Sequence, residues 1–364
     1  MLINNTPTTT IWYDDRDSNV YIIDQRLLPH EFIVTKLQSL DDFCFAIKEM
    51  QVRGAPLIGV TAAYGLAIAL RADASDTAEK EIVQQLIATR PTAMNLRWAI
   101  ERIQKLISAY PESEKAKVAL AEAHIIREED ITICEQIGVN GLSIIQTLYQ
   151  QKQRTINILT HCNAGWLATV DWGTALAPIY KAHFADIPIH IWVDETRPRN
   201  QGASLTAFEL SEQGIDHTLI TDNAGGHLMQ HGMVDLCIVG SDRTAANGDV
   251  CNKVGTYLKA LAAFDNQIPF YVALPTSTID WEITDGIKEI PIEERNPEEV
   301  THISGLNEDG QVTTVKLVKD SKASNYSFDV TPARLVTALI TEKDVVKADS
   351  SSIEQLKLSL DIQP

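Results

Sequence analysis

The chain has 364 residues, of which 45% are hydrophobic and 22% charged, and its formal net charge is -18. This length accommodates two domains of ordinary size, and the composition is that of a globular protein. The acidic balance argues against nucleic acid and anionic membranes as partners, because both need basic surfaces, but a locally positive site can still take an anionic substrate. The five cysteines form no CxxC pair, which favours a reducing compartment and predicts a cytoplasmic protein.

The sequence gives no sign of targeting to a membrane. The first residues, Met1 to Pro7, have neither a basic region nor a long apolar run, so no signal peptide is expected. The longest nearly apolar run, Gly54 to Leu70, is short for a span of ~20 residues and contains Pro56. A buried helix is therefore the better interpretation of that run.

The first third of the chain predicts a small unit of strands and helices. Short strands are expected at 11–13, 20–24 and 31–35, with helices over 40–49, 57–70 and 95–109. Arg53 stands just before the second of these helices and Arg90 shortly before the third, each beside a proline-led helix start. An arginine there either binds an anion together with the helix N-terminus or is a solvated charge, and both alternatives stay open.

A long helical stretch, Glu112 to Ile145, separates this unit from the rest of the chain. It is rich in Ala, Glu and Ile and contains no pattern typical of a strand. We therefore predict an N-terminal, smaller and mainly helical α+β domain over residues 1–130 and a C-terminal domain over residues 131–364.

From Ile156 onwards, strand and helix patterns alternate, which predicts a mostly parallel, Rossmann-like α/β sheet with helices on both faces. The dinucleotide-binding motif G-x-G-x-x-G does not follow the first strand. A further strand is possible at 311–317, a helix is expected over Ala333–Glu342, and the last ~15 residues resemble a polar tail. The expected strands are 155–160, 189–194, 217–221, 236–240 and 270–274, and the expected helices 167–183, 204–213, 224–230 and 254–265.

Several strand ends run into residues that can carry chemistry, and ligands bind at the carboxyl ends of strands in open α/β sheets. Cys162 follows the first strand and is either a thiolate base or nucleophile or a small buried side chain. Asp242 follows the fourth strand and is a general acid in an apolar pocket, the ion-pair partner of Arg243 or a helix cap.

Two further pairs of residues are candidates for binding. Asn252 and Lys253 precede a helix and can hold a phosphate or sugar hydroxyls, although Lys253 can equally be a solvated charge. His227 and His231 lie four residues apart, as metal ligands on a helix do, but no Glu stands at the intervening metalloprotease position. No metal site is therefore assigned.

A set of motifs in one order gives the chain a resemblance to a known family. It resembles the S-methyl-5-thioribose-1-phosphate isomerases of methionine salvage, which share a superfamily with ribose-1,5-bisphosphate isomerases and with the α, β and δ regulatory subunits of the guanine-exchange factor for translation initiation. The resemblance covers residues ~10 to 345. The motifs are Arg53 to Gly59, Thr160 to Gly165, Asp194 to Pro198 with Gln201-Gly202, Asp222 to Ala224, Gly240 to Arg243 with Ala246 to Asp249, Asn252 to Tyr257 and Ile292 to Arg295.

The resemblance implies an aldose–ketose isomerase that acts on 5-methylthioribose 1-phosphate without a metal or organic cofactor and assembles as a homodimer. It implies that Asp242 is the proton donor and that Cys162 helps to move the proton from C2 to C1, either as base or as stabiliser of an enol-type intermediate, although a direct hydride shift stays open. The positions implied to hold the substrate are Arg53, Gly54, Ala55, Arg90, Gln201, Asn252 and Lys253.

Two alternatives within the superfamily stay open. A regulatory member without catalysis typically lacks the cysteine and aspartate, and both are present here. A ribose-1,5-bisphosphate isomerase needs cations at C5, where a methylthio group needs an apolar wall. Trp166 departs from the small residue that the family often has, and we expect it to shape that wall, whereas Ser204 replaces an expected arginine.

Overall fold

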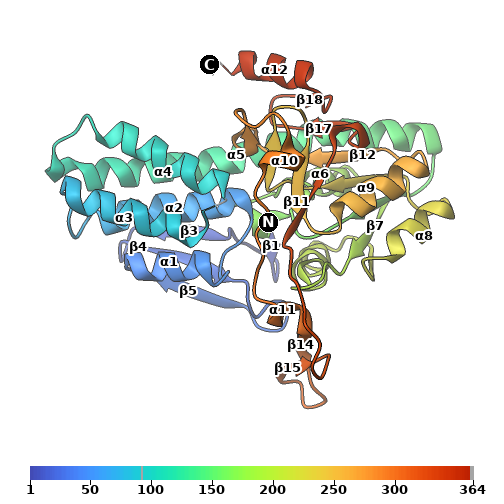
Figure 1. The fold of residues 1–364 in the computed structure, drawn as a ribbon, viewed down its shortest axis with the longest axis horizontal. Helices are drawn as coiled ribbons and strands as arrows, with labels where there is room; N and C mark the ends of the chain where they lie inside the picture. The colour runs from blue at the N-terminus through green and yellow to red at the C-terminus, as the bar shows by residue number, and fades with distance from the viewer. Residues whose placement is uncertain (92, 361–364) are drawn as a thin grey trace.

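The computed structural model describes residues 1–91 and 93–360, which form two parts placed side by side (Figure 1). In the N-terminal part, three antiparallel strands in the order β3-β4-β5 accompany a group of helices, as the sequence predicted, with one further helix, α3. The elements are β1 (Leu2–Ile3), β2 (Thr6–Pro7), β3 (Ile11–Asp14), β4 (Asn19–Asp24), β5 (Ile33–Leu37), α1 (Leu40–Lys48), α2 (Ala55–Ala69), α3 (Asp76–Thr89) and α4 (Met94–Ile107).

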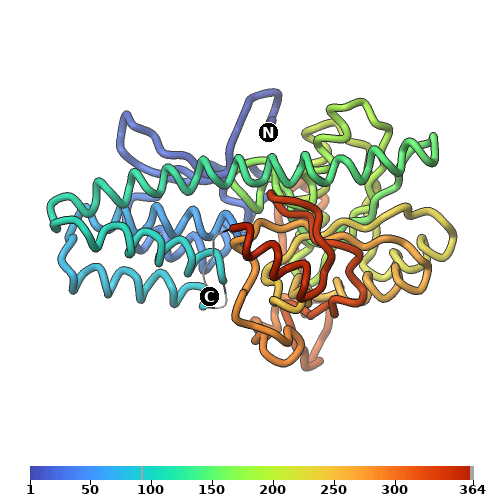
Figure 2. The backbone as a smooth tube through the Cα atoms, turned by 90° about the horizontal axis from the view of Figure 1, so that it is seen from above, coloured from blue at the N-terminus to red at the C-terminus, as the bar shows by residue number. Residues whose placement is uncertain are grey.

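The two parts share one helix, α5 (Glu112–Lys152), which runs along nearly the whole length of the molecule (Figure 2). Its first half packs against α2 and α4, and its second half packs against α6 (Ala177–Phe184) and β6 (Ile156–Thr160) of the C-terminal part. Along α5 the buried side chains change from one hydrophobic core to the next between Ile126 and Ile137. The domain boundary that we propose near residue 130 therefore falls inside a continuous helix rather than in a linker.

The C-terminal part is built on a seven-stranded sheet in which every pairing is parallel except that of β17 with β18. Without the antiparallel edge strand β18, its spatial order is β8-β7-β6-β9-β12-β17, so numbering these six strands along the chain gives 3-2-1-4-5-6. That is the doubly wound Rossmann order, in which ligands bind where the connections reverse direction, between β6 and β9. The strands are β6 (Ile156–Thr160), β7 (Ile189–Asp194), β8 (His217–Ile220), β9 (Leu236–Val239), β12 (Phe270–Ala273), β17 (Ala338–Ile340) and β18 (Val345–Val346).

Helices cover both faces of this sheet, which confirms the predicted fold class. The side chains of β9 alternate between two cores: Leu236 and Ile238 pack with α5 and α6, whereas Cys237 and Val239 pack with α8, α9 and α12. A strand buried on both faces reads as a continuous apolar run, which is why β9 could be predicted. The helices are α6 (Ala177–Phe184), α7 (Ala207–Glu212), α8 (Ala224–Gln230), α9 (Thr256–Asp265) and α12 (Ser350–Ser359). Among the helices of the described residues, none combines the length and apolar character that crossing a bilayer requires.

A second, four-stranded sheet was not predicted. Its order is β13-β10-β11-β16, and it carries Asn252 and Lys253 at the end of β11, not in a loop before a helix. A hairpin of β14 and β15 projects from the body near α11 (Figure 1). The remaining elements are β10 (Arg243–Ala245), β11 (Val250–Lys253), β13 (Ile279–Asp280), α10 (Gly286–Glu289), α11 (Glu298–Thr301), β14 (His302–Leu306), β15 (Val312–Lys316) and β16 (Phe328–Thr331).

Three predicted elements were wrong in detail. The helix expected over Ala333–Glu342 is a 3-10 turn, Ala333–Leu335, followed by β17, because pairing with the open edge of β12 satisfies the backbone there. The helix expected over 167–183 begins only at Ala177, after an irregular loop. The polar tail contains α12, whose Ile353 and Leu356 are buried against the sheet.

Asp130, in the middle of α5, gives a test of the fold. Burial raises the pKa of its carboxyl to about 7, far above the ~3.9 of an unfolded chain. Between these values the folded protein keeps a proton that the unfolded chain releases, so the free energy of unfolding decreases as the pH rises through this window. Asp130→Asn retains an oxygen that can accept the hydrogen bond from the Val170 N–H (2.7 Å).

Because an amide has no charge to lose, the Asp130→Asn variant is expected to be more stable than the wild type above neutral pH, by about 2–4 kcal/mol. Its advantage should disappear below the pKa of the unfolded aspartate. Urea titrations of both proteins over a range of pH measure this difference. Parallel pH profiles of the two free energies of unfolding would contradict a buried, protonated Asp130.

Candidate active site

Cys162 and Asp242 follow the two strands, β6 and β9, between which the sheet connections reverse direction. These strands are direct neighbours, with Leu159 opposite Cys237. The carboxyl ends of parallel neighbours meet at one edge of a sheet, so the fold alone brings these two residues together.

One cavity at this edge, which we call the inner cavity, is lined by every residue that the sequence singled out as catalytic or substrate-binding. It encloses about 640 Å³ of empty space, including its open mouth. The residues are Arg53, Gly54, Ala55, Arg90, Cys162, Gln201, Asp242, Asn252 and Lys253. Four separate parts of the chain contribute to it: the start of α2, the end of α3 at Arg90, the carboxyl edge of the large sheet, and β11 of the second sheet.

The start of α2 reaches the inner cavity because of a glycine. Gly54 has φ +94, and a Cβ there would lie 2.4 Å from the Ala168 backbone oxygen, so no other residue fits without a shift of the backbone. Among the described residues no side chain caps this helix, and Pro56 follows within its first turn. The free backbone N–H groups of a 15-residue helix therefore begin at the cavity, an arrangement that attracts anions.

Cys162 is held in a strained backbone conformation, with φ +67. Two hydroxyl groups fix it: its N–H donates to Thr196 Oγ1 (2.8 Å), and Thr206 Oγ1 donates to its carbonyl oxygen (2.7 Å). Its thiol lies 3.6 Å from Gln201 Oε1. Such strain in a residue other than glycine is typical of functional sites, where the surrounding contacts maintain it.

The pKa values of the two residues respond to burial and to the same cations. Burial raises the pKa of the Cys162 thiol, while Lys253 and Arg53 partly oppose that rise. Burial also raises the pKa of the Asp242 carboxyl, against the opposing effect of Lys253, Arg90 and Arg53. Asp242 is partly accessible, but the surface that it exposes faces the inner cavity. The raised pKa values favour the protonated, uncharged forms of both groups, the thiol of Cys162 and the carboxyl of Asp242.

Cationic side chains outnumber the acids of the cavity wall. Lys253 is buried, which lowers the pKa of its ammonium group, and Nζ lies 4.6 Å from the centre of the Phe328 ring. Arg53 donates to both the side chain and the backbone carbonyl of Asn163. Arg90 differs from both, because its Nε and Nη1 are buried without a hydrogen-bond partner among the described residues. Buried donors of this kind are rare unless a ligand satisfies them.

Supporting residues around the cavity were not predicted. Glu209 accepts hydrogen bonds from Asn163 Nδ2 (2.8 Å) and from the backbone N–H of Trp166 (2.8 Å) and Leu167 (3.0 Å), and so orients the partner of Arg53. Nothing in its sequence context distinguishes Glu209 from an ordinary helical glutamate. Phe328, which lies beside Lys253, belongs to a strand that the sequence did not reveal.

One group of side chains near the cavity has the spacing of metal ligands. The ligand atoms of His161, Asp194 and Asp222 all lie within 4.8 Å of one another. His161 contacts Asp194 Oδ2 through Nδ1 (2.8 Å) and the Val254 carbonyl oxygen through Nε2 (2.9 Å). Lys259 Nζ lies 3.1 Å from the same Asp194 oxygen, and its positive charge would repel a metal ion there. We therefore interpret the group as a structural link between β6 and the turn after Lys253.

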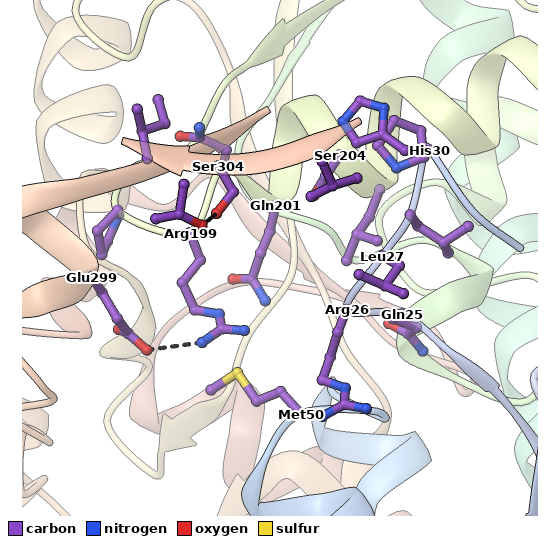
Figure 3. A pocket seen from close by; sticks show the side chains of 18 of the residues that line it. Gln25, Arg26, Leu27, His30, Met50, Arg199, Gln201, Ser204, Glu299 and Ser304 are labelled. Carbon is purple, nitrogen blue, oxygen red and sulfur yellow. Dashed lines mark hydrogen bonds and ion pairs between the residues drawn. The ribbon is translucent and has the colours of Figure 1, made fainter. Parts of the chain in front are cut away.

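A wider outer cavity opens in front of the inner one, with Met50, Arg53 and Gln201 lining both. Figure 3 shows it, with Gln201 near its centre and Arg199 paired with Glu299 at 2.9 Å. Ser204 lines this outer cavity. Trp166, which we expected to shape the wall of the substrate pocket, instead lies fully buried in the core beneath it and lines neither cavity.

The fold and the site define a class of protein. A sequence model of the Initiation factor 2 subunit family matches residues 51–348, and the chain belongs to this family. Within it, the chain belongs with the methylthioribose-1-phosphate isomerases. The enzyme of that name from Paramagnetospirillum magneticum is 61% identical over 357 residues, which cover 98% of this chain and 99% of the relative.

Solved structures agree with this placement. The crystal structure of 5-methylthioribose 1-phosphate isomerase from Pyrococcus horikoshii is 39% identical, with a TM-score of 0.82 and 97% of each chain covered. The structure named translation initiation factor eIF-2B, subunit delta, from A. fulgidus is 37% identical, with a TM-score of 0.76, and covers 96% of this chain and 100% of that chain. These two structures are almost equally similar in sequence to the chain, but their names describe different functions. We therefore infer catalysis from the residues of the site.

Proposed function

We propose that this chain is an aldose–ketose isomerase, an intramolecular oxidoreductase, that converts 5-methylthioribose 1-phosphate to 5-methylthioribulose 1-phosphate in methionine salvage. The single observation that carries the proposal is the inner cavity, where Cys162 and Asp242 lie together with Arg53, Arg90 and Lys253. The relatives with the same printed name support the choice of substrate.

The phosphate on C1 binds at the start of α2. Arg90 supplies two buried donors without a partner among the described residues, and the backbone N–H groups after Gly54 supply the positive end of a helix dipole. Arg53 and Lys253 add two positive charges to the same cavity. This local charge lets a protein of net charge -18 bind an anion.

The chemistry must open a ring whose C1 oxygen carries phosphate, so a free aldehyde is not available. Asp242 donates its proton to the ring oxygen, and the bond between that oxygen and C1 breaks. The proton on C2 then leaves, which forms a C1–C2 double bond that carries the C2 hydroxyl. Return of a proton to C1 and loss of the hydroxyl proton give the C2 ketone. Burial of Asp242 supports its role, because a protonated carboxyl is needed near neutral pH.

Cys162 is the base that carries the proton from C2 to C1. Its backbone contacts hold it in position, Gln201 contacts its sulfur, and Lys253 and Arg53 stabilise the thiolate form against the effect of burial. Asn252 donates to Thr256 Oγ1 (3.0 Å), which leaves its amide oxygen available to a sugar hydroxyl at the cavity wall.

Arg90 provides a test of the phosphate site. Arg90→Met is expected to raise KM by roughly 10- to 100-fold, because hydrogen bonds to a charged group contribute about 1.5–3 kcal/mol. The same change removes buried donors that have no partner in the described chain, so the free energy of unfolding should not fall. Kinetics and thermal melts measure the two effects together.

The matched control for Arg90 is Arg97→Met, which changes an exposed arginine on α4 that pairs weakly with Glu101 at 3.8 Å. Its KM should equal that of the wild type. An Arg90→Met protein with normal KM and lowered stability would show that this arginine is structural and that the phosphate binds elsewhere.

The proposed function itself is tested by following turnover by NMR with 5-methylthioribose 1-phosphate and ribose 1,5-bisphosphate side by side. Conversion of the methylthio substrate, with little or none of the bisphosphate, is the expected result. Preference for the bisphosphate would make the chain a ribose-1,5-bisphosphate isomerase. Folded protein without turnover of either would favour a regulatory role.

We also propose that the protein acts in the cytoplasm as a homodimer. Its described cysteines are all unpaired, as in a reducing compartment. Leu258 and Phe264 on α9 are 58% and 63% exposed, and apolar side chains of this kind are suited to an interface with a second copy. Light scattering at several protein concentrations measures the mass, and a monomer throughout would refute the dimer.

A further inference from the structure

His161, the residue before Cys162, is buried between two groups that accept hydrogen bonds. It is only 1% exposed. Its Nε2 lies 2.9 Å from the Val254 carbonyl oxygen, and its Nδ1 lies 2.8 Å from Asp194 Oδ2. A carbonyl oxygen can only accept a hydrogen bond, so Nε2 carries a hydrogen. Whether the ring is charged therefore depends on Nδ1.

The surroundings of Asp194 place a second hydrogen on the ring. Lys259 Nζ lies 3.1 Å from the same oxygen, Oδ2, and an ammonium group at this distance favours the ionised form of a carboxyl group. The other oxygen, Oδ1, is buried without a hydrogen-bond partner among the described residues, so a hydrogen on it would have no acceptor. An ionised Asp194 has no hydrogen to donate, so Nδ1 donates to it. The ring is then an imidazolium ion with two N–H groups.

The charges around the ring agree with an imidazolium ion. Asp222 Oδ1 lies 3.9 Å from His161 Nδ1. Burial raises the pKa of the Asp329 carboxyl, and His161 and Lys259 oppose that rise. Together with Asp194, three carboxyl groups thus lie around the ring and Lys259. A charge on His161 brings this group closer to neutrality, which lowers the cost of burying its charges.

The two N–H groups join the large sheet to the end of β11 in the second sheet. Val254 directly follows Lys253, the last residue of β11. The ring also packs closely against the next residue, because a Cβ at Gly255 would lie 3.1 Å from its Cε1 and Nε2. The position of Lys253 in the inner cavity therefore depends on His161.

Lys253 acts on both of the residues to which we assign proton transfer. Burial raises the pKa of the Cys162 thiol and of the Asp242 carboxyl, and Lys253 opposes that rise more than any other cation. If its ammonium group moved away from Cys162, less of the thiol would be ionised at a given pH. A displacement of about 1 Å in an active site can lower the rate by roughly 10²-fold.

We propose that His161 is a doubly protonated positioning residue that holds Lys253 beside Cys162, an inference that rests on the proposed function. One N–H binds Asp194, and the other binds the carbonyl group that follows Lys253. The two hydrogens also exclude a metal ion from the group of His161, Asp194 and Asp222, because a metal ligand needs a ring nitrogen without a hydrogen.

The protonation of His161 is tested without an assay of turnover. NMR of protein made with isotope-labelled histidine counts the ring nitrogens that carry a hydrogen, and the His161→Gly spectrum shows which signals belong to His161. Two N–H groups are expected. A single N–H group, or loss of these signals on addition of zinc, would overturn the proposal.

The positioning role is tested by chemical rescue. His161→Gly is expected to lower kcat roughly 10- to 100-fold and to shift the alkylation of Cys162 by iodoacetamide to higher pH, because the thiolate loses the nearby ammonium group. His161 lines the inner cavity, so added imidazole can reach the vacated space. An imidazolium ion has two N–H groups and 1-methylimidazolium has one. Imidazole should therefore restore much of kcat and the alkylation profile, and 1-methylimidazole little.

The matched control is His190→Gly, in a histidine of β7 that contacts Thr218 Oγ1 through Nε2 (2.9 Å) and does not line the inner cavity. It should keep the wild-type kcat and alkylation profile. Rescue of His161→Gly by both compounds alike or by neither, or wild-type behaviour without rescue, would overturn the proposal. Failure of the proposed function looks different: wild-type protein would turn over neither sugar phosphate, while NMR and alkylation would still decide the role of His161.

Discussion

Replacing Asp242 with asparagine is expected to lower kcat by roughly 10²–10⁴-fold, the usual contribution of a positioned general acid. The asparagine has the same shape and keeps the backbone N–H that donates to the Cys251 carbonyl oxygen (2.9 Å), but it has no acidic proton for the ring oxygen. Substrate affinity should change little, because Arg90 and the start of α2 hold the phosphate. NMR turnover and calorimetric binding separate the two quantities.

The pH profile of the wild type tests the same assignment. Activity requires one proton on the pair, with Asp242 protonated and Cys162 ionised. Below the pKa of Asp242 both groups are protonated, and above the pKa of Cys162 neither is, so kcat falls on both sides and is highest between. Burial raises both pKa values, which moves both limbs of the profile to higher pH than free side chains would give. A kcat that is unchanged in Asp242→Asn would contradict the proton-donor role.

Replacing Cys162 with alanine should cause a loss of similar size, and serine distinguishes its two possible roles. If the thiolate is the base, Cys162→Ser is as inactive as Cys162→Ala, because a hydroxyl group does not ionise in this pH range. If the thiol only donates a hydrogen bond to the enol-type intermediate, serine preserves much of the activity. We expect serine and alanine to be equally inactive, by roughly 10²–10⁴-fold in kcat.

The matched control for Cys162 is Cys237→Ser, in a buried cysteine of β9 that does not line the inner cavity. It should lower stability and leave kcat unchanged. A kinetic isotope effect with deuterium at C2 of the substrate completes the test, since proton removal by Cys162 breaks that bond. In a hydride shift, the deuterium would move from C2 to C1 without exchange with water. Complete retention of deuterium on C1 of the product, even in variants that open the cavity to water, would therefore favour that route.

The large sheet could be predicted because its strands are apolar runs that both faces bury, as in β9. The second sheet could not. Its strands are short and partly polar, and β11 pairs with β16, with Cys251 opposite Val330, far away in sequence. The region after Pro332 shows that a local sequence pattern can be overridden by tertiary pairing. A proline-led start predicted a helix there, but Ala338–Ile340 forms a strand because it pairs with the edge of β12.

More of the site than of the surrounding fold could be predicted from the sequence. Cys162 and Asp242 follow apolar strands, and the rule that ligands bind at the carboxyl ends of such strands places them together. The substrate-holding positions came from a family resemblance, not from spacing. Trp166 was assigned to the pocket wall because it is large and follows a motif, but only the packed structure shows that it lies buried in the core.

The central claim is that one inner cavity binds the sugar phosphate between Cys162 and Asp242. A crystal structure of the Asp242→Asn variant with 5-methylthioribose 1-phosphate tests it most directly. We predict the phosphate within hydrogen-bond distance of Arg90 and the first N–H groups of α2, the ring oxygen facing position 242, and Cys162 beside C2. A substrate bound in the outer cavity, between Arg199 and His302, with the inner cavity empty, would contradict the account.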